Sequence, residues 1–176
     1  MDHQPKLRLL LFSECNRKCP GCCNNDWDLS QLPICKDYSP YKSIMLTGGE
    51  PMLHPEIVIR AAQEIHKYTG APTYLYTADP RKLLYVLPYI NGVVLTLHDE
   101  TDKYPFYKLQ HTLNPDFAKT KSMRLNIFKE VGRVAYMDYW KVKENIVWIK
   151  NCPLPEDEVF MRYNLPGYFI SQGSKP

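Results

Sequence analysis

The chain has 176 residues, with 22 Lys and Arg, 19 Asp and Glu, and a formal net charge of +3. This length suits one domain with a real core, and the basic residues are too scattered to support nucleic-acid binding. The apolar run at 7–12 is far too short to span a bilayer, and no secretion-type leader opens the sequence. We therefore expect a protein of the reducing cytoplasm that has no membrane partner.

Apolar runs alternate with helical patterns along most of the chain. The predicted strands are 6–12, 43–47, 73–77, 92–97 and 123–128, the predicted helices are 55–68 and 80–89, and one or two further strands are expected after about 129. From about 151 we expect a short tail whose last residues are loosely ordered. This alternation predicts an α/β fold with a parallel sheet, in which ligands bind at the carboxyl ends of the strands.

Four of the six cysteines lie within residues 15–23, directly after the first predicted strand. Cys15, Cys19 and Cys22 have the spacing C-x3-C-x2-C, which lets three thiolates converge from one loop. A structural zinc site needs four ligands, and no second C-x2-C pair exists. Three thiolates instead suit a 4Fe–4S cluster with one iron left open, and in a reducing compartment we expect metal ligands rather than disulfides.

The remaining cysteines are Cys23, Cys35 and Cys152, which are widely spaced and form no paired motif. We therefore expect a single iron–sulfur cluster. For Cys152 we expect the role of a small buried apolar residue.

A second motif, GGEP, follows the strand at 43–47 and consists of Gly48, Gly49, Glu50 and Pro51. The two motifs in this order resemble those of the radical S-adenosylmethionine superfamily. The resemblance implies a partial (β/α)6 barrel, here trimmed because residues 23–42 are too short and polar for the usual first helix. It also implies that residues 1–176 form a single core domain of this type.

The resemblance further implies a 4Fe–4S cluster and S-adenosylmethionine as cofactors. The reduced cluster would cleave S-adenosylmethionine to methionine and a 5′-deoxyadenosyl radical, which abstracts hydrogen from a substrate. The GGEP turn would meet the amino end of the cofactor, although Glu50 also suits bracing of the turn. Many relatives carry an aromatic residue before the third cysteine, where this chain has Gly21, whose backbone is left to meet the adenine.

By position in the resemblance, polar residues at the ends of the later strands would meet the ribose. These residues are Thr77, Thr96 or His98, and Asn126. Each of them also suits an ordinary turn or capping role, which is the commoner case. No catalytic residue beyond the cofactor ligands is predicted.

The small size leaves little chain to cover the mouth of such a barrel. The cysteine loop, with Asn24 after the third cysteine, is similar to that of the activating enzymes of glycyl radical enzymes. The resemblance thus suggests a glycine of a partner glycyl radical enzyme as the substrate, and flavodoxin or ferredoxin as the electron donor. The alternatives are a self-contained enzyme acting on a small molecule or nucleotide and, less favoured, a non-catalytic metal-binding module.

Overall fold

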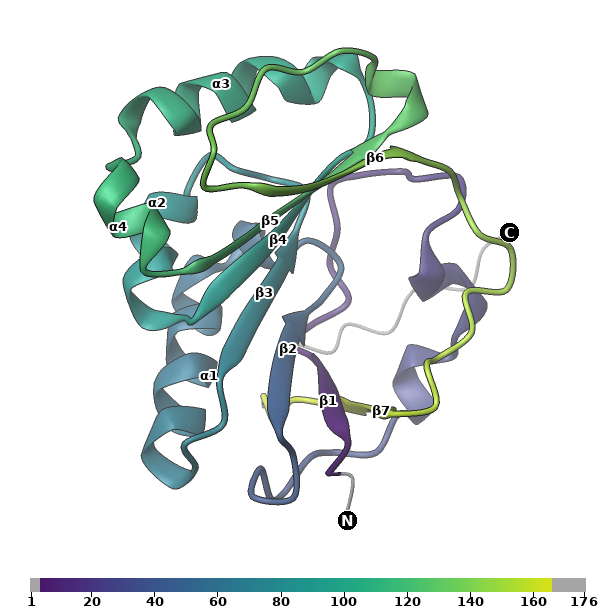
Figure 1. Ribbon diagram of the computed structural model, residues 1–176. Helices are drawn as coiled ribbons and strands as arrows, with labels where there is room; N and C mark the ends of the chain where they lie inside the picture. Colours follow the sequence, from purple (N-terminus) through teal and green to yellow (C-terminus); the bar gives the residue numbers. More distant parts are fainter. Residues whose placement is uncertain (1–3, 166–176) are drawn as a thin grey trace.

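The computed structural model describes residues 4–165, and its centre is one seven-stranded sheet (Figure 1). The strand order is β6-β5-β4-β3-β2-β1-β7, and every neighbouring pair is parallel. The sheet does not close, since β6 and β7 are its two outer strands. The strands are β1 Lys6–Leu10, β2 Ser43–Thr47, β3 Thr73–Thr77, β4 Gly92–Leu97, β5 Ser122–Phe128, β6 Lys141–Ile146 and β7 Glu158–Arg162.

Four α-helices lie on one face of this sheet, to the left and top of the view in Figure 1. They are α1 Pro55–Tyr68, α2 Leu83–Val86, α3 Lys103–Thr112 and α4 Pro115–Lys119. In α1, Pro55 and Glu56 suit the first turn, and the buried residues recur at helical spacing. That apolar stripe packs on the sheet and forms the main core together with Leu7, Ile44, Leu46, Leu75 and Leu95.

The opposite face of the sheet is covered only in part. The chain between β1 and β2 crosses it with two short 3-10 helices, Cys23–Asp26 and Leu29–Gln31. Leu29 and Leu32 from this segment pack on Leu10 and Phe160, and so cover the β1–β7 side. The β3–β6 side buries Val94 and Phe128, and its other side chains are mostly polar and are exposed or half-buried.

Most predicted strands are confirmed, and the differences concern the helices and the tail. The helix predicted at 80–89 is wrong in its extent, since α2 covers only Leu83–Val86 and a 3-10 turn at Leu87–Tyr89 follows it. The loop expected at 23–42 is confirmed, because no α-helix joins β1 to β2. Between β5 and β6 the connection likewise has only a 3-10 turn, at Lys129–Val131. Helices α3 and α4 were not predicted. The segment predicted as a short tail from about 151 contains a strand of the sheet, β7. This strand pairs with β1 from Lys6↔Glu158 to Leu10↔Arg162. The residues expected to be loosely ordered at the end lie outside the described range.

Within residues 4–165, no helix has both the length and the apolar character needed to cross a membrane.

Candidate functional site

The cysteine loop and the GGEP turn are joined by hydrogen bonds at the carboxyl ends of β1 and β2. The Gly49 amide donates to the Phe12 carbonyl at 2.9 Å, and the Glu50 amide donates to the Glu14 carbonyl at 2.9 Å. From beyond the third cysteine, the Asn24 side-chain amide donates to the Gly48 carbonyl at 2.8 Å. The two sequence motifs therefore form one structural unit.

This close approach explains both glycines of the turn. A Cβ on Gly49 would overlap the Glu14 carbonyl group, and a Cβ on Gly48 would lie 3.1 Å from the Phe12 carbonyl oxygen. The sequence suggests that glycine is needed here for approach to a ligand, whereas in the structure the crowding comes from the cysteine loop itself. Pro51 is buried and begins the 3-10 turn Pro51–Leu53 that leads into α1.

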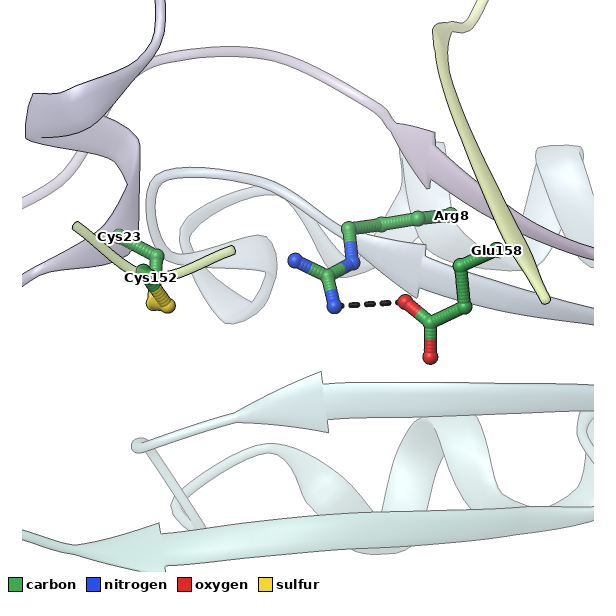
Figure 2. The surroundings of a disulfide bond; sticks show 4 residues. All are labelled: Arg8, Cys23, Cys152 and Glu158. Carbon is green, nitrogen blue, oxygen red and sulfur yellow. Dashed lines mark hydrogen bonds and ion pairs between the residues drawn. A yellow bond between two sulfur atoms is a disulfide. The ribbon is translucent and has the colours of Figure 1, made fainter. Parts of the chain in front are cut away.

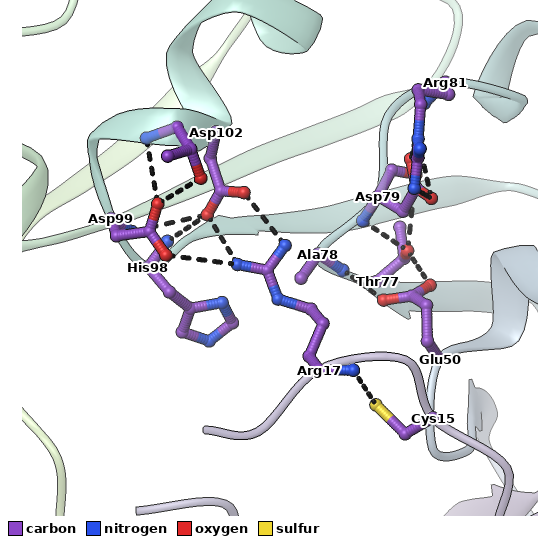
Figure 3. Close-up of polar contacts among 11 residues, drawn as sticks. Cys15, Arg17, Glu50, Thr77, Ala78, Asp79, Arg81, His98, Asp99 and Asp102 are labelled. Atoms are coloured by element: carbon purple, nitrogen blue, oxygen red, sulfur yellow. Dashed lines mark hydrogen bonds and ion pairs between the residues drawn. The ribbon is translucent and has the colours of Figure 1, made fainter. Parts of the chain in front are cut away.

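Glu50 is the buried centre of this unit, with 2% of its surface exposed (Figure 3). Its carboxylate accepts hydrogen bonds from the Met52 and Ala78 amides, both at 3.0 Å, and from the Thr77 hydroxyl. Burial raises the pKa of Glu50, although these hydrogen bonds oppose the shift. The contacts match the bracing role for Glu50, and they engage the Thr77 hydroxyl in the same role.

The three thiols of the motif are free, Cys15 being exposed and Cys19 and Cys22 partly buried. Burial raises the pKa of the Cys15 thiol, and the charges of Glu50 and of the other two thiols add to the rise. Burial also raises the pKa of Cys19, where a hydrogen bond and the charge of the Arg17 guanidinium act in the opposite direction. The three thiols are thus within electrostatic reach of one another on one loop.

Arg17, between the first two cysteines, attaches this loop to the end of β4 (Figure 3). Its guanidinium makes two hydrogen bonds of 2.9 Å to the carboxylate of Asp102, which is 4% exposed. Asp102 in turn accepts the backbone amide of His98 at 2.7 Å. Such a bidentate pair fixes orientation as well as distance. The sequence analysis did not identify Arg17, and its only signal was a long cation inside the C-x3-C spacing.

His98 lies beside the cysteine loop under the ring of Trp148. The two rings are parallel within 1°, with their centroids 5.1 Å apart. Trp148 also occupies the space in front of Gly21, where a Cβ would lie 2.7 Å from two carbons of the indole. A ring from a distant segment therefore packs against the loop directly before the third cysteine.

A cavity of about 410 Å³ opens at this place. It is lined by Arg17, Lys18, Cys19, Pro20, His98, Asp99, Thr101, Glu130 and Trp148. The buried Nδ1 atom of His98 has no hydrogen-bond partner among the described residues. The cavity lies against the second cysteine of the motif and has the size of a small-ligand pocket.

Two further candidates, Thr96 and Asn126, lie together but away from this cavity. They are paired across β4 and β5 and half-buried on the sheet face opposite the helices. The structure thus brings Cys15, Cys19 and Cys22 together with the GGEP turn, and places His98 near Cys19. It does not place Thr96 or Asn126 in the lining of the same cavity.

The prediction that no disulfide forms is wrong for one pair, because Cys23 and Cys152 are joined (Figure 2). They are 129 residues apart in sequence and have a Cα–Cα distance of 5.3 Å. Cys152 is partly exposed rather than fully buried, so it is not the small core residue that was expected. Cys35 is buried at 4% exposure, and its thiol donates to the Asp37 carbonyl.

In residues 4–165 no group of three or more His, Cys, Asp or Glu side chains is arranged to hold a single metal ion. The thiolates of a cubane iron–sulfur cluster bind different irons, so they lie farther apart than the ligands of one ion. Three free thiols on one loop, beside the cationic Arg17, are a donor set that fits such a cluster. A scan against protein-family models and a search of curated proteins found no match for this chain.

Proposed function

We propose that this chain is a radical S-adenosylmethionine enzyme. The observation that carries the proposal is the union of the two motifs: the loop with three free thiols is hydrogen-bonded to the GGEP turn where β1 and β2 end. In parallel α/β folds, ligands bind at this edge of the sheet. A loop that only held a structural metal would not need this second motif.

When bound, a 4Fe–4S cluster and S-adenosylmethionine supply one-electron cleavage of the sulfonium, which yields methionine and a 5′-deoxyadenosyl radical. Cys15, Cys19 and Cys22 would hold the cluster, and the GGEP turn would receive the amino end of the cofactor. Arg17 keeps the loop in register with β4 through Asp102. His98 and Trp148 line the adjoining cavity, where they would help to exclude water from a bound cofactor.

The fold is consistent with a trimmed (β/α)6 barrel of the radical S-adenosylmethionine type. Strands β1 to β6 follow one another in the sheet in chain order and are all parallel. The connections from β1 to β2 and from β5 to β6 contain 3-10 turns in place of α-helices. Strand β7 extends the sheet beyond β1. We place one such core domain in this chain, with flavodoxin or ferredoxin as its electron donor.

The open β3–β6 face is the surface on which a substrate would bind. An activase would use a partner glycyl radical enzyme to cover this face, and a self-contained enzyme would bind a small molecule there. The polar side chains of this face favour the second candidate.

The test is anaerobic reconstitution with iron and sulfide, followed by reduction in the presence of S-adenosylmethionine. The expected result is a brown protein that releases methionine and 5′-deoxyadenosine. Serine at any one of Cys15, Cys19 or Cys22 is expected to abolish the intact cluster. Cys35→Ser is the matched control, since its buried thiol lies outside the loop.

Cys23→Ser is the sharper control because it removes the neighbour of the third ligand. If Cys23→Ser lost iron and Cys22→Ser retained it, the assignment of the third ligand would be wrong. A colourless protein that binds only zinc would instead favour the metal-binding module.

A further inference from the structure

The sheet face opposite the helices carries an unusual set of side chains between β3 and β6. Parallel sheets are normally covered on both faces, and their strands are then apolar on both sides. Here Tyr76, Thr96, Arg124 and Asn126 all lie on this face and are exposed or half-buried. Two apolar side chains on this face are buried, namely Val94 in β4 and Phe128 at the end of β5, where Trp148 packs on it. The four polar side chains between them stay accessible, unlike those of the β1–β7 side under Leu29 and Leu32.

The charge on this face is strongly positive. Cross-strand pairing sets Arg124 beside Lys141 and Asn126 beside Lys143, so both lysines lie on the face of Arg124. Val142, between the lysines, packs against the core on the other side, which agrees with this alternation. No ion pair joins Arg124, Lys141 or Lys143 to an acidic side chain in the described part of the chain.

The acid on this face is already neutralised. Glu158 of β7 is the single acidic residue among the described strand positions of the face, and it binds Arg8 at 2.6 Å (Figure 2). Tyr76 lies in the field of these charges: burial raises the pKa of its hydroxyl, Glu158 adds to the rise, and Arg8 and Arg124 oppose it. A tyrosine on this face offers both a ring and a hydrogen-bonding tip to a ligand.

Lysines on an edge strand such as β6 also discourage pairing with other chains. Protection of a sheet edge does not explain Arg124, because β5 is an internal strand between β4 and β6. An exposed, unpaired guanidinium on an internal strand of a parallel sheet calls for an anionic ligand. The paired N–H donors of arginine match the geometry of phosphate as well as that of carboxylate, and the neighbouring lysines suit the several charges of a phosphate chain.

We propose that the β3–β6 face binds a free nucleotide, with its phosphates on Arg124, Lys141 and Lys143 and its base near Tyr76. Strands are about 4.8 Å apart, so the patch is about 15 Å wide, which suits one nucleotide better than a polymer. Thr96 and Asn126 are the hydrogen-bonding side chains between this patch and the strand ends. This inference rests on the proposed function, for which it names the substrate class.

The test is nucleotide binding by the full chain, measured by equilibrium dialysis with and without a reconstituted iron–sulfur cluster. The probes are GTP, UTP and CTP, each compared with its nucleoside, in the presence of saturating S-adenosylmethionine. We expect at least one triphosphate to bind and its nucleoside to bind much more weakly. Arg124→Gln and Lys143→Gln should each weaken binding about tenfold, the loss typical of a charge-assisted hydrogen bond.

Lys119→Gln is the matched control, since it removes an exposed cation from α4, on the helical side of the sheet. It should leave nucleotide binding unchanged. Unchanged binding by Arg124→Gln, or equal binding of nucleoside and triphosphate, would overturn the proposal. So would tighter binding of single-stranded DNA than of every free nucleotide, or capture of a glycyl radical enzyme on this face.

The two proposals fail separately. Loss of nucleotide binding with intact release of 5′-deoxyadenosine removes only the substrate assignment. Nucleotide binding without any cluster or cofactor cleavage removes only the radical chemistry.

Discussion

Gly49 shows how a single residue determines whether the two motifs meet. Gly49→Ala places a Cβ against the rigid backbone of Glu14, whereas Gly70→Ala has no atom within 4 Å of the added carbon. We expect Gly49→Ala to lower the free energy of unfolding by about 1–3 kcal/mol, as overpacking does elsewhere. Urea unfolding of the two variants measures this difference. Equal stability would mean that the loop is not held as closely as the structure shows.

His98 gives the site a pH dependence with a definite sign. Burial lowers the pKa of His98, and Arg17 lowers it further, while Asp102 and Asp99 act in the opposite direction. The unfolded chain therefore binds the proton more readily than the folded chain. The contribution of neutral His98 to the free energy of unfolding is therefore fully present above the ordinary histidine pKa of about 6.5. It is lost as the pH falls below that value.

The measurement is urea unfolding at pH 7.5 and at pH 5.5, with His98→Phe as the comparison. Phenylalanine keeps a ring against Trp148 but does not titrate. We expect the wild type to lose more stability than His98→Phe between the two pH values. An identical loss in both proteins would show that His98 makes no contribution to the pH dependence.

At the scale of elements, the sequence was a good guide wherever apolar runs were bounded by glycine, proline or polar residues. Strands β2, β3 and β4 and helix α1 match their predicted ranges, since local pattern and burial agree there. Helix α3 was missed because Pro105 and polar residues interrupt its pattern, although Asp99 and Asp102 form a capping box before it. The edge strand β6 was expected only in outline, because its exposed charges give it no clear period.

The parts that were not predictable depend on contacts between distant segments. Strand β7 is a short apolar run between charged residues in a proline-rich stretch, and its pairing with β1 makes it a strand. The same holds for Trp148 against Gly21 and for Cys23 with Cys152, whose proximity no local spacing encodes. The ligand residues of the site came from short motifs, whereas the residues that hold the motifs in place, such as Arg17, came from the structure.

At the scale of the whole molecule, the Cys23–Cys152 disulfide should contribute strongly to stability. It closes a loop of about 130 residues, for which chain-entropy arguments give about 5 kcal/mol as an upper range. We expect dithiothreitol to lower the urea midpoint of the wild type but not that of Cys152→Ser. Cys35→Ser should respond to dithiothreitol as the wild type does. An unchanged wild-type midpoint would mean that the bond does not form in solution.

The same disulfide divides the chain into a covalent ring and two free arms. Strands β2 to β6 and all four α-helices lie inside the ring, while β1 and β7 lie on the arms and pair with each other. A force on the two ends of the oxidised chain could not extend the ring. The fully stretched chain would therefore be shorter by up to about 460 Å than the reduced chain. Because β1 and β7 are parallel, that force would enter one strand at its start and leave the other at its end. Their ladder would then be loaded in shear, with its hydrogen bonds strained together rather than opened one by one.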